Sequence, residues 1–167
     1  MNRKAVFAGS FDPFTLAHLD IVQKASALFD SVVVLVGVNR RKRPFLSLER
    51  RLRLIEKTLG AMPNVSVDSF DGLTVDYLKK VGGKFLIRGI RSSSEFDAER
   101  NLAWNNRLLN PFSETVFFPV APEYAAISSS AVREILSFGG DVSKMLPASI
   151  FNDLRNGDLP DVRTETL

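Results

Sequence analysis

The sequence contains no cysteine and only one histidine, His18, among its 167 residues. The absence of cysteine excludes disulfides, thiolate metal sites and thiol catalysis. A single imidazole also excludes a zinc ion held by several histidines and any mechanism that needs two of them. The sequence also lacks a large excess of charge of one sign, because 22 basic and 19 acidic side chains give a net charge of only +3. Such a small excess argues against nucleic acid as the main partner.

Long apolar runs are also missing. The longest, Val32 to Val38, is far shorter than the roughly 20 residues that a membrane-spanning helix needs. The apolar stretch near the N-terminus breaks at Ser10-Phe11-Asp12-Pro13, too early for the core of a signal peptide. We therefore expect a cytoplasmic protein that has neither a membrane nor a nucleic acid as a partner.

What the sequence does contain is a regular alternation of short apolar runs and helical patterns, which predicts strands and helices in turn. The expected strands are 5–8, 32–36, 65–70, 85–87 and 115–120. The expected helices are 21–29, 47–59, 74–81, 95–109, 128–138 and 148–154. This order predicts an α/β fold, a single Rossmann-like domain with a five-stranded parallel sheet and helices on both faces. The domain should span 1–155, and the polar segment 156–167 should be a flexible tail.

In a parallel sheet of this kind, ligands bind outside the carboxyl ends of the strands, where the strand order reverses. After the first strand, the segment Gly9 to His18 places the histidine in the first turn of a helix, where free N–H groups favour an anion. A histidine without a function is the usual interpretation of such a position. At the expected ligand edge, a hydrogen bond from its imidazole to a phosphate is the better hypothesis.

Basic and hydroxyl side chains follow three other strands. Arg40 to Arg43 form a basic run, which is usually a solvated loop but can also bind nucleic acid or hold a phosphate. Arg88 and Arg91 follow a buried strand, where guanidinium groups need anions, so phosphate recognition is favoured. Glu99 in the next helix could orient an arginine, accept from a ribose hydroxyl or form a surface salt bridge. Ser128 to Ser130 offer hydroxyls and free backbone donors at a helix start. Neither a Walker loop nor a G-x-G-x-x-G fingerprint is present.

Three motifs together resemble a known family. They are Gly9-Ser10-Phe11-Asp12-Pro13 with Thr15-x-x-His18, then Arg88-Gly89-x-Arg91, then Ile127-Ser128-Ser129-Ser130-x-Val132-Arg133-Glu134. The first is similar to the (H/T)-x-G-H signature of the nucleotidyltransferase superfamily, and the set resembles bacterial phosphopantetheine adenylyltransferases. The resemblance implies adenylyl transfer from ATP to 4′-phosphopantetheine, giving 3′-dephospho-coenzyme A and pyrophosphate. It also implies Mg²⁺ as cofactor and a homohexamer.

The resemblance further implies roles for individual residues. His18 would stabilise the transition state at the α-phosphate, with Lys42 and Arg91 as further catalytic cations. The residues expected to bind substrates form two overlapping sets. The ATP set is Ser10, Phe11, His18, Gly89, Ile90, Arg91, Glu99, Tyr124, Ile127, Ser128, Ser129 and Ser130. The phosphopantetheine set is Ser10, Lys42, Thr74 and Arg88, and no residue is assigned to a metal.

The match has departures. Ala17 stands where the signature has glycine, and its methyl group could crowd a nucleotide packed against that backbone. Ser10 replaces threonine but keeps the hydroxyl. The attacking group of the implied reaction is itself a phosphate, so neither a covalent enzyme intermediate nor a strong general base is required. The task left to the protein is to bring two anions together in line and to stabilise the charge that develops.

Three alternatives remain open on the sequence alone. The chain could be another nucleotidyltransferase of this fold, such as a nicotinate-mononucleotide adenylyltransferase or a glycerol-phosphate cytidylyltransferase. It could be a nucleotide-binding module without activity, in which Ala17 marks a decayed site. A nucleic-acid binder that uses Arg40 to Arg43 is the least favoured, because that basic run stands alone.

Overall fold

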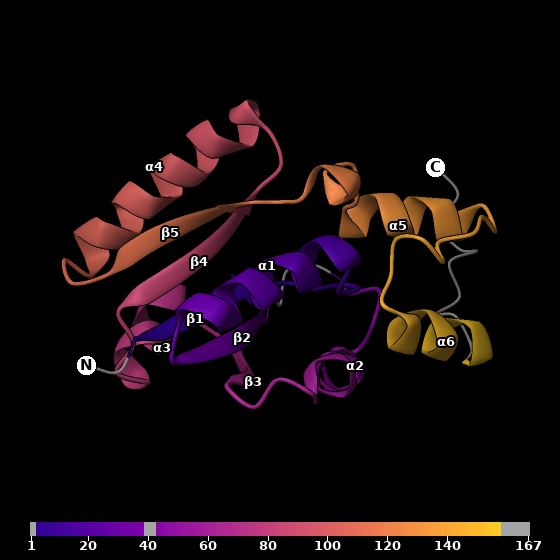
Figure 1. Cartoon of the computed structure of the whole chain (residues 1–167), viewed down its shortest axis with the longest axis horizontal. Coiled ribbons are helices and arrows are strands. Elements are labelled where there is room, and N and C mark those ends of the chain that lie inside the picture. Colours follow the sequence, from indigo (N-terminus) through magenta and orange to yellow (C-terminus); the bar gives the residue numbers. More distant parts are fainter. Residues whose placement is uncertain (1–2, 39–42, 158–167) are drawn as a thin grey trace.

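The structure is a computed structural model that describes residues 3–38 and 43–157. Strands and helices alternate along the chain, as the apolar pattern predicts (Figure 1). The strands are β1 (Lys4–Gly9), β2 (Ser31–Gly37), β3 (Val65–Phe70), β4 (Phe85–Ile90) and β5 (Glu114–Pro119). The helices are α1 (Leu16–Leu28), α2 (Leu48–Leu59), α3 (Thr74–Lys80), α4 (Ser93–Leu109), α5 (Ser129–Ser137) and α6 (Ala148–Asn156). A short 3₁₀ helix, η1 (Pro122–Tyr124), precedes α5 and was not predicted.

All four strand pairings are parallel, in the order β3-β2-β1-β4-β5. The order therefore reverses between β1 and β4, which makes their carboxyl ends the expected ligand edge. The fold class predicted from the sequence is confirmed. No helix in the described ranges is long and apolar enough to cross a membrane.

The central strands carry apolar side chains on both faces of the sheet, and helices cover both faces for that reason. On one face, Ala5 and Phe7 of β1 pack in a large core with α1 and α2. On the other face, Val6 packs in a smaller core with Val75 and Leu78 of α3. Figure 1 shows α5 beyond the carboxyl end of β5, and α6 close to α2. This arrangement leaves the carboxyl ends of the central strands facing α5.

The fourth strand is longer than the sequence predicts. The fourth strand was expected to end at Ile87, but β4 continues through Arg88 to Ile90. Arg88 is therefore a strand residue paired in register with Phe117, and only Arg91 lies beyond the strand. The last helix also reaches Asn156, one residue into the segment predicted as a tail.

Candidate active site

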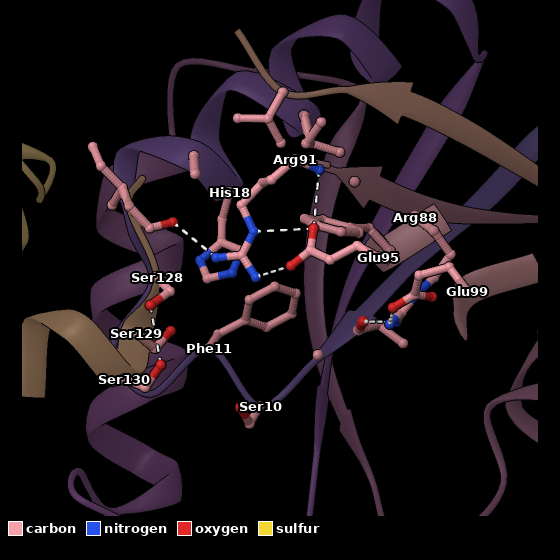
Figure 2. Close-up of a pocket in the computed structure, with 18 of the residues that line it drawn as sticks. Ser10, Phe11, His18, Arg88, Arg91, Glu95, Glu99, Ser128, Ser129 and Ser130 are labelled. Carbon is pink, nitrogen blue, oxygen red and sulfur yellow. Dashed lines mark hydrogen bonds and ion pairs between the residues drawn. The ribbon is translucent and has the colours of Figure 1, made fainter. Parts of the chain in front are cut away.

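A cleft of about 390 Å³ opens at the switch point of the sheet. Its lining comes from six places in the sequence: β1 and the loop after it, α1, the end of β4 and the turn after it, α4, the residue after β5, and the start of α5. The predicted site residues that line it are Ser10, Phe11, His18, Arg88, Gly89, Arg91, Glu99, Ile127, Ser128, Ser129 and Ser130. The expected convergence of the imidazole and both guanidinium groups on one cavity is confirmed (Figure 2).

His18 is held by the start of its own helix. Thr15 is the N-cap of α1, and its backbone N–H donates to His18 Nδ1 at 3.0 Å. Burial of the ring, reinforced by the positive charge of Arg91, lowers the pKa of His18 from 6.5 to about 4. The imidazole is therefore neutral at pH 7. Because Nδ1 accepts a hydrogen bond, the ring proton sits on Nε2, which makes that atom a donor.

Aromatic side chains set the plane of the imidazole. The rings of Phe11 and Phe14 have their centroids 5.1 and 5.4 Å from that of His18, and the Phe11 ring meets it edge-on. Both phenylalanines are fully buried. Rigid apolar neighbours leave the imidazole little rotational freedom, so the direction of its Nε2–H bond is fixed before a ligand binds.

Arg91 lies beside His18 (Figure 2). Its guanidinium group forms an ion pair with Glu95, one turn into α4, and donates to the Ile127 carbonyl at 3.2 Å. Burial tends to raise the pKa of Glu95, but hydrogen bonds from Arg91 and the charges of Arg91 and Arg88 outweigh it and lower the pKa. Glu95 is thus a carboxylate at neutral pH, and it holds Arg91 across the cleft.

Arg88 has a carboxylate partner of its own. Its Nε and Nη2 atoms donate to the two oxygens of Glu99 at 2.5 Å each, and Nη1 donates to the Ala8 carbonyl at 3.1 Å. The prediction that Glu99 could orient an arginine is confirmed for Arg88, and α4 supplies a second carboxylate, Glu95, to Arg91. Arg88 and Arg91 also pair with different turns of α4, so they are two separate cationic positions at one cleft.

The serines at the start of α5 are partly used by the protein itself. Ser128 is the N-cap, and its hydroxyl accepts from the Ala131 N–H at 3.1 Å. Ser129 donates its hydroxyl to the Pro13 carbonyl at 2.8 Å, which ties the start of α5 to the loop after β1. The N–H groups of the first turn of α5 therefore face the same cleft as His18, as an anion site requires.

Three of the described residues predicted for the site, Thr74, Ile90 and Tyr124, do not line this cleft. Lys42 lies outside the described residues. Thr74, at the start of α3, lines a smaller cavity of about 60 Å³ that Arg88 also borders. Ile90 and Tyr124 do not line the cleft: the first ends β4 and the second ends η1.

Two charged residues that line the cleft, Glu95 and Arg133, were not among the predicted site residues, although Arg133 belongs to the third motif. Arg133 donates from Nη1 to the Asp12 carbonyl at 2.6 Å. The signal for Glu95 was its spacing of four residues after Arg91, which is typical of a helical ion pair. The signal for Arg133 was its position one turn after the serine cap, on the helix whose start faces the ligand edge.

Comparisons with known proteins agree with this geometry. The Cytidylyltransferase-like family matches residues 6–135, more than half of the chain. A solved structure from Vibrio parahaemolyticus, described as a nicotinate-nucleotide adenylyltransferase, superposes with a TM-score of 0.69 over 93% of this chain and 100% of its own. At 18% identity, this likeness shows a common fold and nothing more specific.

Sequence relatives are far closer. Phosphopantetheine adenylyltransferase of Rubrobacter xylanophilus is 48% identical over 151 residues, which is 90% of this chain and 92% of the relative. The enzymes of that name from Lachnoclostridium phytofermentans and Synechocystis are each 46% identical, and they cover 87% and 90% of this chain and 89% and 94% of their own. With this identity along nearly its full length, the chain belongs to the phosphopantetheine adenylyltransferases.

Proposed function

We propose that this chain transfers the adenylyl group of ATP to 4′-phosphopantetheine by in-line displacement in the cleft around His18. A phosphate oxygen of phosphopantetheine forms a bond to the α-phosphorus of ATP, and the bond from that phosphorus to the pyrophosphate oxygen breaks. The products are 3′-dephospho-coenzyme A and pyrophosphate. The convergence of the neutral His18 ring with Arg88 and Arg91 in one cleft is the observation that carries this proposal.

In this mechanism His18 acts as a hydrogen-bond donor and not as a base. Its Nε2–H bond points from a fixed ring, so it stabilises negative charge on the α-phosphate without reorganisation. A phosphate nucleophile carries no proton that must be removed, which agrees with the absence of a second imidazole. In this proposal, the first-turn N–H groups of α5 and the guanidinium group of Arg91 hold the phosphates of ATP.

Arg88 is assigned to the phosphate of phosphopantetheine, together with Lys42 and the hydroxyl of Ser10. The small cavity next to Arg88 supports this assignment, because its other walls are largely apolar and come from β1, β4, α3 and α4. Thr74, Leu102 and Asn106 line it. An arginine beside apolar and amide side chains suits the end of a pantetheine arm that carries the phosphate.

Mg²⁺ is proposed as a companion of ATP. Mg²⁺ prefers oxygen ligands, keeps several waters and is commonly held by substrate phosphates. Within the described ranges, no group of three or more histidine, cysteine or acidic residues is placed to hold a metal ion. The two carboxylates of the cleft, Glu95 and Glu99, are both occupied by arginines. The donor set fits an ion bound mainly by triphosphate oxygens and water.

We also propose that copies of this chain assemble, as a homohexamer, through α4. This helix of 17 residues has none that is buried. Its exposed apolar side chains include Trp104, Leu108 and Leu109, and Phe112 follows at 80% exposure. Such a surface is larger than single scattered apolar residues and is typical of an interface. Leu108→Glu should dissociate the assembly in light scattering. Phe138→Glu, at an exposed apolar position directly after α5, should leave it intact.

One incubation tests the reaction. The protein is mixed with ATP, Mg²⁺ and 4′-phosphopantetheine, and the product is identified by mass spectrometry. CTP as donor, and nicotinate mononucleotide or glycerol phosphate as acceptors, serve as comparisons. Dephospho-coenzyme A with equimolar pyrophosphate supports the proposal. A product from another acceptor alone, or ATP binding without release of pyrophosphate, contradicts it.

Both substrates are cytoplasmic metabolites, so the cytoplasm is the proposed location.

A further inference from the structure

Arg51 is a buried cation outside the cleft. It belongs to α2, is only 6% exposed, and is not among the residues that line the cavity. Burial lowers the pKa of its guanidinium group, and the charge of Asp12 opposes that effect. Its Nη1 atom donates to the Ser10 carbonyl at 2.7 Å, whereas its Nε atom has no hydrogen-bond partner among the described residues. A buried charge with incomplete partners is costly, so stability alone does not explain its presence.

The contact with Ser10 fixes a peptide unit of the site. Among the described residues, only the Asp12-Pro13 bond is cis, so the bond between Ser10 and Phe11 is trans. In a planar trans peptide, the C=O and N–H bonds point in opposite directions. The Ser10 carbonyl points at Arg51, away from the cleft, and therefore the N–H of Phe11 points to the other side of the loop. No hydrogen bond from this N–H is found within the described ranges.

The backbone at this peptide is not a relaxed one. Phe11 has a φ of 47°, in the left-handed region that residues other than glycine rarely adopt. Such a conformation persists only where the surroundings hold it. Here the holding groups are the Arg51 guanidinium on the Ser10 carbonyl and the burial of the Phe11 ring, which is 2% exposed.

Asp12 connects the loop after β1 to a second segment, which leads into α2. Its carboxylate accepts from the N–H groups of Phe45 and Leu46 at 2.7 and 2.8 Å. These residues lie just after the segment that carries Lys42. The loop after β1 and the segment leading into α2 are thereby joined beneath the cleft, close to the positive charge of Arg51.

We infer that Arg51 is a positioning residue, which orients and polarises the Ser10–Phe11 peptide so that the Phe11 N–H donates to a substrate phosphate. A cation on a carbonyl oxygen draws electron density from the same amide and makes its N–H a stronger donor. The donor is thus prepared before the substrate arrives, as electrostatic stabilisation requires. The inference deepens the proposed function and rests on it for the identity of the phosphate.

The test compares Arg51→Gln with Arg50→Gln. Arg50 is the neighbouring residue on α2, and its ion pair with Asp153 at 2.8 Å joins α2 to α6. Each protein is labelled with ¹⁵N-phenylalanine and titrated with pyrophosphate while the amide signal of Phe11 is followed. Turnover of ATP and phosphopantetheine is measured well below the melting temperature and normalised to folded protein.

In the unmodified protein and in Arg50→Gln, pyrophosphate should move the Phe11 amide proton downfield. In Arg51→Gln that shift should be lost. The kcat should fall about tenfold to a hundredfold, less than deletion of a preorganised donor costs, because the donor is misaligned and not removed. Arg51→Lys, which keeps one donor and the charge, should recover part of both signals.

Three results would overturn the inference. The first is a Phe11 amide signal that does not shift when the unmodified protein is titrated with pyrophosphate. This result would refute the inference even if Arg51→Gln does not fold. The second is a folded Arg51→Gln with normal kcat and a normal shift. The third is an equal loss of kcat in Arg50→Gln, which would indicate a purely structural effect. An unmodified protein that makes no dephospho-coenzyme A would instead refute the proposed function, and the pyrophosphate titration would still report on Arg51.

Discussion

The neutral imidazole of His18 makes a quantitative prediction about stability and pH. Burial lowers its pKa from 6.5 to about 4, so the folded protein resists a proton that the unfolded chain accepts. A group of this kind stabilises the fold above the unfolded pKa, and the stabilisation is lost as the pH falls through that value toward the folded one. Between pH 4 and 6.5, stability should therefore rise with pH.

The size of the effect follows from the two pKa values. Lowering the pH from about 7.5 to about 5 should cost the fold about 2 kcal/mol through His18 alone. The figure is insensitive to the folded value, because a pKa of about 5 instead of 4 still gives about 1.6 kcal/mol. Burial of the ring is the main reason for the lowered pKa, and the positive charge of Arg91 adds to it. A protonated Nδ1 also could no longer accept the hydrogen bond from the Thr15 N–H.

Urea denaturation at the two pH values, with the unmodified protein and His18→Gln, isolates this contribution. Other groups, such as Glu95, titrate in both proteins, so their effects cancel in the difference. The unmodified protein should lose more unfolding free energy on acidification than the variant does. The imidazole proton signals should also titrate near pH 4 in the free protein. An equal loss in both proteins, or a midpoint near 6.5, would refute the assigned tautomer and burial.

Three further outcomes are expected. His18→Ala should lower kcat by roughly 10²–10³ with little change in ATP affinity by calorimetry, because one preorganised donor is lost; near-normal turnover would remove this residue from the mechanism. Arg88→Ala and Lys42→Ala should each raise the KM for phosphopantetheine about tenfold to a hundredfold, because each removes a charge-assisted hydrogen bond. An unchanged KM in both variants would contradict the assignment of these residues to the phosphate of phosphopantetheine. Ala17→Gly should lower the KM for ATP in steady-state kinetics, since the buried methyl group lines the cleft; an unchanged KM would show that this methyl does not touch the nucleotide.

The fold was predictable because its signals are local. Continuous β-branched runs such as Val32 to Val36 mark strands buried on both faces, and the serine caps at Ser47 and Ser128 mark helix starts, each with the expected hydrogen bond. The strand order is not local, because it depends on which strands pair. The position of the ligand edge could therefore be stated from the sequence only as a rule, and not as a pair of strands.

The site was predicted less completely, for a geometric reason. The end of β4 was placed too early, and the two arginines were treated as one pair following the strand. In the structure, Arg88 belongs to the strand and Arg91 to the turn after it, and each meets a different carboxylate of α4. Contacts between a strand end and the next helix depend on the crossover geometry, which single-sequence patterns do not contain. Arg51 was missed for the same reason, since its partner lies 41 residues away.

The two carboxylates of α4, Glu95 and Glu99, compete with phosphates for the two arginines of the cleft. A phosphate that binds Arg91 or Arg88 does not take an unpaired cation out of water, because each guanidinium group already has a glutamate. Binding is instead an exchange of anions, and only the difference between a phosphate and a carboxylate partner contributes to affinity. The released Glu95 and Glu99 can be solvated, since their side chains are 33% and 21% exposed. An exchange of this kind keeps ground-state binding modest. The Nε2–H of His18 has no such competitor among residues 3–38 and 43–157, so it can act fully on the charge that develops in the transition state.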